Sequence, residues 1–353
     1  MAEGAGARMN PKPFPGGFEL VATLGPAADS PAAVAALAAA GATHFRVNLA
    51  HAAPDWLDAV LARAAAGAGA DAGPLPVVAD LPGCKPRTGD LGAPVRLRPG
   101  DRVWLGGPVP AGMEARRIPL DFAEIDCRPR TGDELLLRDG RLRLAVVRTA
   151  GDGCLCEVTV GGEALGRMGV ALTGEAGVRM GRTLPQDLLE RCLRGGVRAF
   201  LLSYCEEAAD LAVVAEACRA RGVEGVRLIP KIETLRALDN LPAILGACET
   251  LCIARGDLGT QVPLPELPGV ERRLLAEARG AGRRAWMAGE VLGGFARAAS
   301  ASRGELAGVW SALDHGAAGF ILSDETAVGP DPSGAVRLLK DLTEAWSRQS
   351  ATH

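Results

Sequence analysis

Short apolar runs alternate with helix-forming stretches along most of the chain of 353 residues. The stretches between the runs, such as PAAVAALAAAGA and PGVERRLLAEARGAG, end at or beside glycine, as helices often do. A strand–helix alternation requires parallel strands, and eight such units are typical of a closed (β/α)8 barrel. The sequence therefore predicts an α/β fold of the TIM-barrel class, with barrel strands at 20–24, 44–49, 76–80, 199–203, 226–230, 250–254, 285–288 and 319–322.

One interval of the chain breaks this rhythm. Between about 88 and 174, the segments VRLRPGDRVWLGG, GDELLLRDGRLRLAVVRTA and GCLCEVTVGG have the alternating pattern of β-strands and carry PGD, RDG and GDG turns. They predict a small all-β, β-barrel-like domain at 88–174, inserted after the third strand, with the barrel at 1–87 and 175–353. Active sites of such barrels lie at the carboxyl ends of the strands, so we expect the insertion to act as a lid.

Charge and cysteine content exclude several classes of protein. Lys plus Arg number 39 against 42 Asp plus Glu, a net charge of −3, and no basic run indicates nucleic acid or an anionic membrane as partner. No apolar run is long enough for a transmembrane helix, and the N-terminus lacks the apolar core of a signal peptide. Nine scattered Cys without a CxxC pair, and four His without a metal-binding spacing, indicate reduced thiols in a cytoplasmic protein and no zinc site.

Polar residues follow most of the predicted strands, at the end where barrel active sites lie. In the segment PKIET, Lys231 and Glu233 are two residues apart on a strand and therefore face the same way. The segment ARGDLG, after the next strand, adds Asp257. Two carboxylates with open positions suit Mg2+ or Mn2+, and a lysine beside the cation can neutralise charge on a transferring phosphoryl group or an enolate. The other polar candidates at this face are Arg46, Asn48, Asp80, Ser203, Arg255, Glu290, Ser323 and Glu325.

These two segments resemble the lysine and metal-binding core of the pyruvate kinase family. Five further segments agree with that family in the same order: VATLGPAADSP, FRVNLAH, ADLPGCKPRTG, GDELLLRDG and LSDETA. The resemblance runs from about residue 19 to 345 and covers both the barrel and the inserted β segments. It implies phosphoryl transfer involving phosphoenolpyruvate and pyruvate, with Mg2+ or Mn2+ as cofactor.

The resemblance also implies a role for each matching residue. Glu233 and Asp257 would hold the divalent cation, and Lys231 would act on the phosphoryl group or on the enolate. The other implied roles are phosphoryl contact by Arg46, substrate binding by Ser203 and by the backbone amides of Gly256 and Asp257, nucleotide contact by His51 and Arg87, and a monovalent-cation site at Asn48 and Asp80.

The monovalent-cation site departs from the family pattern. Ala50 and Leu81 stand where potassium-dependent members carry Ser and Thr, so two oxygen ligands are absent. Lys85 stands where those members carry Glu, which resembles the potassium-independent branch. Lysine is rare in this chain, at four of the 39 basic residues, and its ammonium is a compact charge that arginine does not reproduce. We therefore expect Lys85 to take the electrostatic role of the monovalent cation, so that K+ is not required.

The seventh strand departs from the family as well. The segment WMAGEV places Gly289 where the family has a threonine implicated in proton delivery to the enolate carbon, and glycine supplies no donor. Glu290 replaces a family Gln and is a candidate catalytic acid, with a loop cap as the alternative. Glu206 stands in place of a family Arg, and a nucleotide-side Lys is replaced near Leu184 or Pro185. These changes leave the phosphoryl acceptor open.

Three functions fit this pattern. The first is divalent-metal-dependent phosphoryl transfer from phosphoenolpyruvate, to ADP or to another acceptor. The second is metal-dependent enolpyruvate chemistry without a nucleotide, either decarboxylation of a 2-oxo acid or aldolase-like or lyase-like C–C bond chemistry. The third is a non-catalytic protein that keeps the pocket.

The expected partners follow from these functions. They are a small-molecule substrate, either phosphoenolpyruvate or a 2-oxo acid, with a nucleotide and a second copy in a homodimer as open options. Because the sequence ends soon after the eighth barrel helix, we do not expect the effector control that the family's C-terminal regulatory domain provides.

Overall fold

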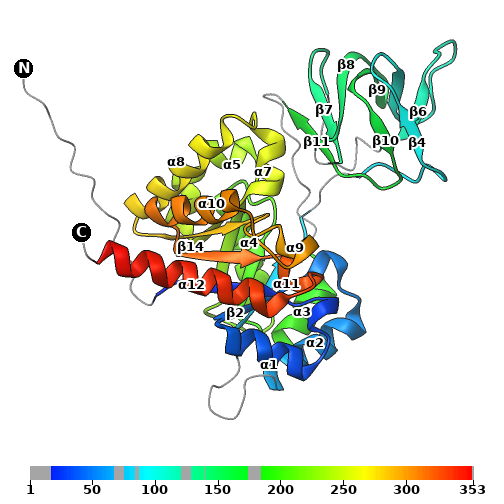
Figure 1. The fold of residues 1–353 in the computed structure, drawn as a ribbon. Coiled ribbons are helices and arrows are strands. Elements are labelled where there is room, and N and C mark those ends of the chain that lie inside the picture. The colour runs from blue at the N-terminus through cyan, green and yellow to red at the C-terminus, as the bar shows by residue number, and fades with distance from the viewer. Residues whose placement is uncertain are drawn as a thin grey trace, which may run out of the picture.

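A barrel of strands surrounded by helices forms one part of the protein (Figure 1). It is closed by eight parallel strands in the order β1-β16-β15-β14-β13-β12-β3-β2. The computed structural model describes residues 17–66, 75–83, 87–120, 129–138, 140–173 and 184–351. The barrel confirms the predicted fold class. Its strands are β1 (Glu19–Thr23), β2 (His44–Asn48), β3 (Val77–Leu81), β12 (Ala199–Leu202), β13 (Arg227–Ile232), β14 (Thr250–Ala254), β15 (Arg284–Ala288) and β16 (Gly319–Leu322).

Helices surround the barrel, and local sequence signals set their ends (Figure 1). In the first helix, the Ser30 hydroxyl accepts a hydrogen bond from the Ala33 amide, and Gly41 ends the helix with φ of +116°. The helices are α1 (Pro31–Ala40), α2 (Pro54–Ala66), α3 (Gln186–Arg194), α4 (Ala208–Arg219), α5 (Leu235–Asp239), α6 (Leu241–Ala247), α7 (Arg255–Gln261), α8 (Leu267–Gly280), α9 (Phe295–Ala298), α10 (Arg303–Asp314), α11 (Asp324–Ala327) and α12 (Pro332–Ser350), with 3-10 turns η1 (Pro26–Ala28) and η2 (Leu49–His51).

Side chains fill the barrel, so its interior is a core and not a pore. Alternate strand residues point inward, where Trp286 and Cys252 pack with aliphatic side chains from the neighbouring strands. A second and larger cluster, which includes Phe45 and Phe200, lies between the strands and the helices. The charged residues of the strands lie toward the two ends of the barrel, with Lys231 and Asp80 toward the carboxyl end and Glu19 and Arg227 at the amino end.

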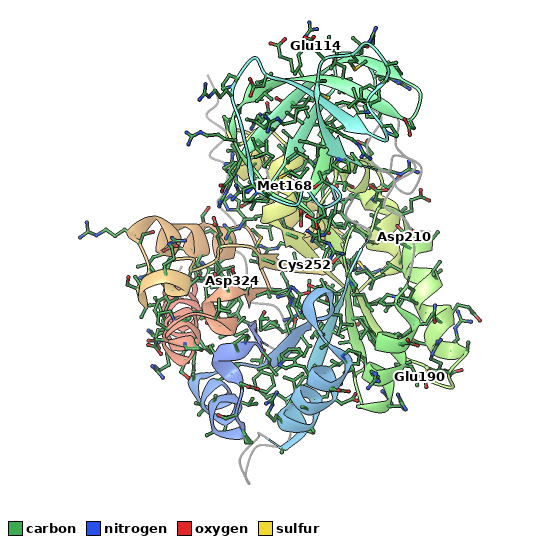
Figure 2. All side chains as sticks on the ribbon, turned by 90° about the vertical axis from the view of Figure 1, so that its right-hand side faces the viewer. Glu114, Met168, Glu190, Asp210, Cys252 and Asp324 are labelled. Atoms are coloured by element: carbon green, nitrogen blue, oxygen red, sulfur yellow. The ribbon has the colours of Figure 1, made fainter. Side chains whose placement is uncertain are left out.

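The interval between β3 and β12 forms separate, mainly antiparallel sheets with a core of their own, and among the strands described there only β5 and β6 pair in parallel. Its six-stranded sheet has the order β11-β7-β8-β9-β5-β6, and β10 pairs with β4. The two views show this inserted part beside the barrel, with Glu114 at its far end and Met168 on the side toward the barrel (Figures 1 and 2). Its strands are β4 (Val95–Leu97), β5 (Arg102–Gly106), β6 (Arg116–Pro119), β7 (Glu134–Leu137), β8 (Leu142–Ala150), β9 (Gly153–Val160), β10 (Gly162–Ala164) and β11 (Val170–Thr173).

The described residues bear on two expectations from the sequence, one about membrane-spanning helices and one about the state of the cysteines. Within those ranges, none of the helices combines the length and the apolar character that crossing a bilayer requires. Seven cysteines in the same ranges are free thiols, and all seven are buried.

The opposite, amino-terminal end of the barrel is closed by a network around Glu19. Its carboxylate accepts hydrogen bonds from Arg227 Nη1 and Nη2 at 2.7 and 3.1 Å, from Arg284 Nε at 2.7 Å and from Trp286 Nε1 at 2.8 Å. Burial alone raises the pKa of Glu19, but the hydrogen bonds and charge of Arg227, with Trp286 and Arg284, outweigh it and lower the pKa to about 2. The network joins three strands that lie far apart in the sequence, β1, β13 and β15, and therefore stabilises closure.

We expect Glu19→Gln to destabilise the protein by about 2 kcal/mol at pH 7, after allowance for solvent screening. The folded-state pKa of about 2 lies below the ordinary value of 4.5, so this stabilisation is present above pH 4.5 and is lost as the pH falls toward 2. The difference in free energy of unfolding between wild type and variant should therefore shrink between these two values. Urea unfolding at several pH values measures it, with exposed Glu114→Gln as the control. An equal difference at every pH would contradict the prediction.

Candidate functional site

An arginine–aspartate pair lies at the carboxyl ends of β2 and β3. Arg46 donates through Nε and Nη2 to Asp80 Oδ2, at 2.9 and 2.6 Å, and through Nη1 to Thr23 Oγ1 at 3.0 Å. Asp80 is only 2% exposed. Burial by itself raises the pKa of Asp80, but the charges of Lys231 and Arg46 and the hydrogen bonds from Arg46 and Ser203 lower it below the ordinary value. Asp80 is therefore ionised and held by two cations of the protein.

Lys231 stands at the centre of the site. Its Nζ lies 3.0 Å from Glu233 Oε1 and 3.4 Å from Asp80 Oδ2, and it donates to Ser203 Oγ at 3.0 Å. Ser203 in turn donates to Asp80 Oδ1 at 3.1 Å. Burial favours the neutral amine, but the carboxylates of Asp80 and Glu233 outweigh it and raise the pKa of Lys231. The lysine therefore carries its charge. β13 runs two residues beyond the predicted strand, so Lys231 is held by the strand itself.

Glu233 follows directly after β13 and is 1% exposed. Burial raises the pKa of its carboxyl to about 6, and the nearby charge of Asp257 adds to this effect while Lys231 opposes it. The two carboxylates follow the neighbouring strands β13 and β14. Such a pair gains most from a cation between its members.

The carboxylates of Glu233 and Asp257 are the candidate ligands for a divalent cation. Only oxygen atoms are offered by Glu233 and Asp257, which suits Mg2+ or Mn2+ and disfavours softer metals. Within the ranges that the structure describes, no group of three or more His, Cys, Asp or Glu side chains could hold a metal ion. Two carboxylates that leave several positions for water or substrate are the pattern that Mg2+ adopts in enzymes that act on phosphates.

The structure adds Tyr204, which the sequence analysis did not single out. Its backbone amide donates to Glu233 Oε2 at 2.6 Å, and its hydroxyl donates to Asp257 Oδ1 at 2.9 Å. It is the single tyrosine of the chain and directly follows Ser203 at the end of β12. That rarity and that position were the signals available in the sequence.

Gly256 and Gly289 approach each other closely at the ends of β14 and β15. A Cβ atom added at Gly289, where φ is +89°, would lie 3.1 Å from the Gly256 amide nitrogen. Arg255 holds this turn because its Nε donates to the Gly289 carbonyl oxygen at 2.9 Å. A threonine in this backbone conformation would be strained and would crowd the amide.

Other predicted site residues lie outside the Lys231 cluster. Glu290 is exposed, with φ of +49°. Asn48 Oδ1 caps η2 by accepting from the Ala50 amide at 3.1 Å, and Arg87 is exposed and donates to the Arg167 carbonyl oxygen at 3.2 Å. Lys85 and the side chain of His51 lie outside the described residues. The structure therefore brings together Arg46, Asp80, Ser203, Lys231, Glu233 and Asp257.

Fold and site together define a (β/α)8-barrel protein whose strand ends carry a lysine surrounded by carboxylates, with a β-sheet insertion after the third barrel strand. Residues 18–336 match the family model described as pyruvate kinase, barrel domain. The chain belongs to the pyruvate kinase family, which confirms the resemblance seen in its motifs.

Several curated relatives share most of the chain. It is 32% identical over 334 residues to a pyruvate kinase of Mycobacterium intracellulare, a match that covers 92% of this chain and 69% of the relative. It is 32% identical over 344 residues to a pyruvate kinase of Mycobacterium tuberculosis, covering 94% and 70%. A pyruvate kinase of Methylorubrum extorquens is 28% identical over 340 residues, covering 94% and 69%.

Proposed function

We propose that this protein is a phosphotransferase that acts on phosphoenolpyruvate with a divalent cation, ADP or another acceptor taking the phosphoryl group. The single observation that carries the proposal is the charged Lys231 between Asp80 and Glu233, at the carboxyl ends of the barrel strands. Phosphoryl transfer depends mainly on positioning and on charge stabilisation, and this cluster supplies both. We also propose that the protein is cytoplasmic.

In this proposal Glu233 and Asp257 hold Mg2+ or Mn2+, which supplies Lewis-acid stabilisation of the substrate oxygens. Lys231 neutralises the negative charge that develops on the enol oxygen as its bond to phosphorus breaks. Arg46 has five N–H groups, so it can keep its bonds to Asp80 and Thr23 and still donate to a phosphoryl oxygen. The backbone amide of Gly256, left uncrowded because residue 289 is glycine, binds the substrate carboxylate.

The decisive experiment is pyruvate formation from phosphoenolpyruvate and ADP with Mg2+ or Mn2+, in an assay coupled to reduction of pyruvate. We expect turnover that depends on the divalent cation. No product above that of Lys231→Ala would overturn ADP as the acceptor, and other nucleoside diphosphates then identify whether a different acceptor is used.

One observation favours a second candidate function, enolpyruvate chemistry without a nucleotide. Gly289 offers no proton donor, and its backbone conformation disfavours a side chain that could supply one. Lys231 could then stabilise an enolate that reacts with a carbon electrophile or a proton from solvent, and a cation held by Glu233 and Asp257 would supply Lewis-acid stabilisation. Metal-dependent deuterium exchange at C3 of pyruvate, together with oxaloacetate turnover without ADP, tests this candidate. If neither is observed, the candidate is rejected.

We further propose that K+ is not required. The Asp80 carboxylate is already paired with Arg46 and Lys231, which supports a site that needs no monovalent cation. We expect equal activity in Na+, K+ and tetramethylammonium buffers, and a loss of about tenfold or more in Lys85→Met, because one fixed positive charge is removed. The control is Lys340→Met, a change on α12 that should leave activity unchanged. A strict requirement for K+ would contradict this prediction.

A further inference from the structure

Tyr204 connects the two carboxylates of the proposed cation site, although it belongs to neither of their strands. Its amide reaches Glu233 after β13, and its hydroxyl reaches Asp257 at the start of α7. We propose that Tyr204 is a positioning residue that sets the separation and orientation of the two carboxylates, and thereby the affinity of the site for a divalent cation. This inference rests on the proposed cation site.

The backbone of Tyr204 is unusual in a way that serves this role. Its φ is +54°, a left-handed conformation that bulky residues rarely adopt and that the surrounding contacts must maintain. In this conformation the amide donates to Glu233 Oε2 at 2.6 Å while the hydroxyl of the same residue donates to Asp257 Oδ1 at 2.9 Å. One residue therefore sets the distance between the two acids.

Gly83, in the segment after β3, fixes the position of the tyrosine ring. A Cβ atom at Gly83 would lie 2.5 Å from Tyr204 Cδ2 and 2.9 Å from the Ser203 carbonyl oxygen. The backbone of this segment thus lies directly against the ring, at a distance that glycine alone permits. Any side chain at residue 83 would displace the ring and with it the hydroxyl.

A hydroxyl that holds a metal-binding carboxylate acts through orientation. Groups that support a ligand in this way typically change metal affinity by about 10–100-fold when they are removed. The phenyl ring of Tyr204→Phe keeps the packing against Gly83 and the amide bond to Glu233, while the hydroxyl that donates to Asp257 is removed. We expect its Mn2+ affinity to fall about tenfold.

The experiment measures Mn2+ binding by electron paramagnetic resonance of the free ion, on the full chain and without substrate. Tyr204→Phe and Gly83→Ala should both bind Mn2+ about tenfold more weakly than wild type, with thermal unfolding as a check of folding. Gly280→Ala, on α8 where an added Cβ meets nothing within 4 Å, is the matched control and should bind as wild type does. Saturating Mn2+ should restore kcat in Tyr204→Phe, which a general structural defect would not allow.

The outcomes separate this inference from the proposed cation site. If wild type and Glu233→Gln both fail to bind Mn2+, the site itself is wrong. If wild type binds Mn2+ and Tyr204→Phe binds it within twofold of the same affinity, the positioning role of Tyr204 is overturned and the site stands. If Tyr204→Phe does not fold, the affinity of Gly83→Ala decides between the two results.

Discussion

Lys231→Met should reduce kcat for pyruvate formation by about a thousandfold, with much less effect on substrate affinity. Removal of one preorganised group that stabilises developing charge costs about 100- to 1,000-fold in other enzymes, and this lysine carries a full charge in a site with little exposure. Its Nζ contacts Ser203, Glu233 and Asp80, whereas Arg46 is already bound to Asp80 and Thr23. Steady-state kinetics with saturating phosphoenolpyruvate and divalent cation measure the loss.

A matched control separates this effect from the loss of a lysine in general. Lys340, on α12, pairs with Glu344 at 3.8 Å and is about half exposed, so Lys340→Met should leave kcat unchanged. Lys231→Met should also lower the free energy of unfolding by about 3–5 kcal/mol, because Asp80 and Glu233 lose a buried partner. Kinetics are therefore measured well below the unfolding temperature. Wild-type kcat in a folded Lys231→Met protein would contradict the proposed role.

Glu233→Gln should abolish the divalent-cation-dependent activity. The change keeps the size of the side chain and the bond from the Tyr204 amide but removes the negative charge of one of the two proposed ligands. We expect Mn2+ affinity to fall by more than about 100-fold, beyond the effect of groups that only support a ligand. Mn2+ binding and the activity at increasing Mg2+ concentration measure the change, and chelation of the wild type by EDTA should reproduce the loss.

The matched control for this variant is Glu206→Gln. Glu206 is also buried, and its carboxylate accepts from Thr234 Oγ1 at 3.0 Å and lies 3.9 Å from Arg236 Nε, neither of which belongs to the Lys231 cluster. We expect it to leave Mn2+ affinity and activity near the wild-type values. Equal metal affinity in Glu233→Gln and wild type would contradict the assignment of Glu233 as a ligand.

Much of the fold could be read from periodicity. Each barrel strand is a short apolar run between helix-forming stretches, and this alternation is why the barrel could be predicted. The segments between β3 and β12 have the period-two alternation and the turns that indicate β-strands. Part of the site could also be predicted from periodicity. Lys231 and Glu233 are two residues apart, and in a strand such residues share one face, whatever the rest of the molecule does.

The residues that depend on loop conformation were harder to predict. Glu290 was a candidate catalytic acid, and the structure leaves it exposed with a left-handed backbone. Tyr204 was not singled out, yet it contacts both Glu233 and Asp257. Both residues have positive φ, a conformation that is rare for such side chains and that tertiary contacts must impose, so the local sequence carries no signal for it.

The sequence by itself determined the barrel, the inserted β segments, the family and the charged residues at the strand ends, because these depend on local periodicity and on motifs. The tertiary structure decided which charges meet. Closure of the barrel brings Asp80 within reach of both Arg46 and Lys231, and it brings Glu19 against Arg227 and Arg284 at the other end. The partners of a buried charge set its protonation and its stability, and those partners lie on strands far apart in the chain. Their identity therefore follows from the packed fold alone.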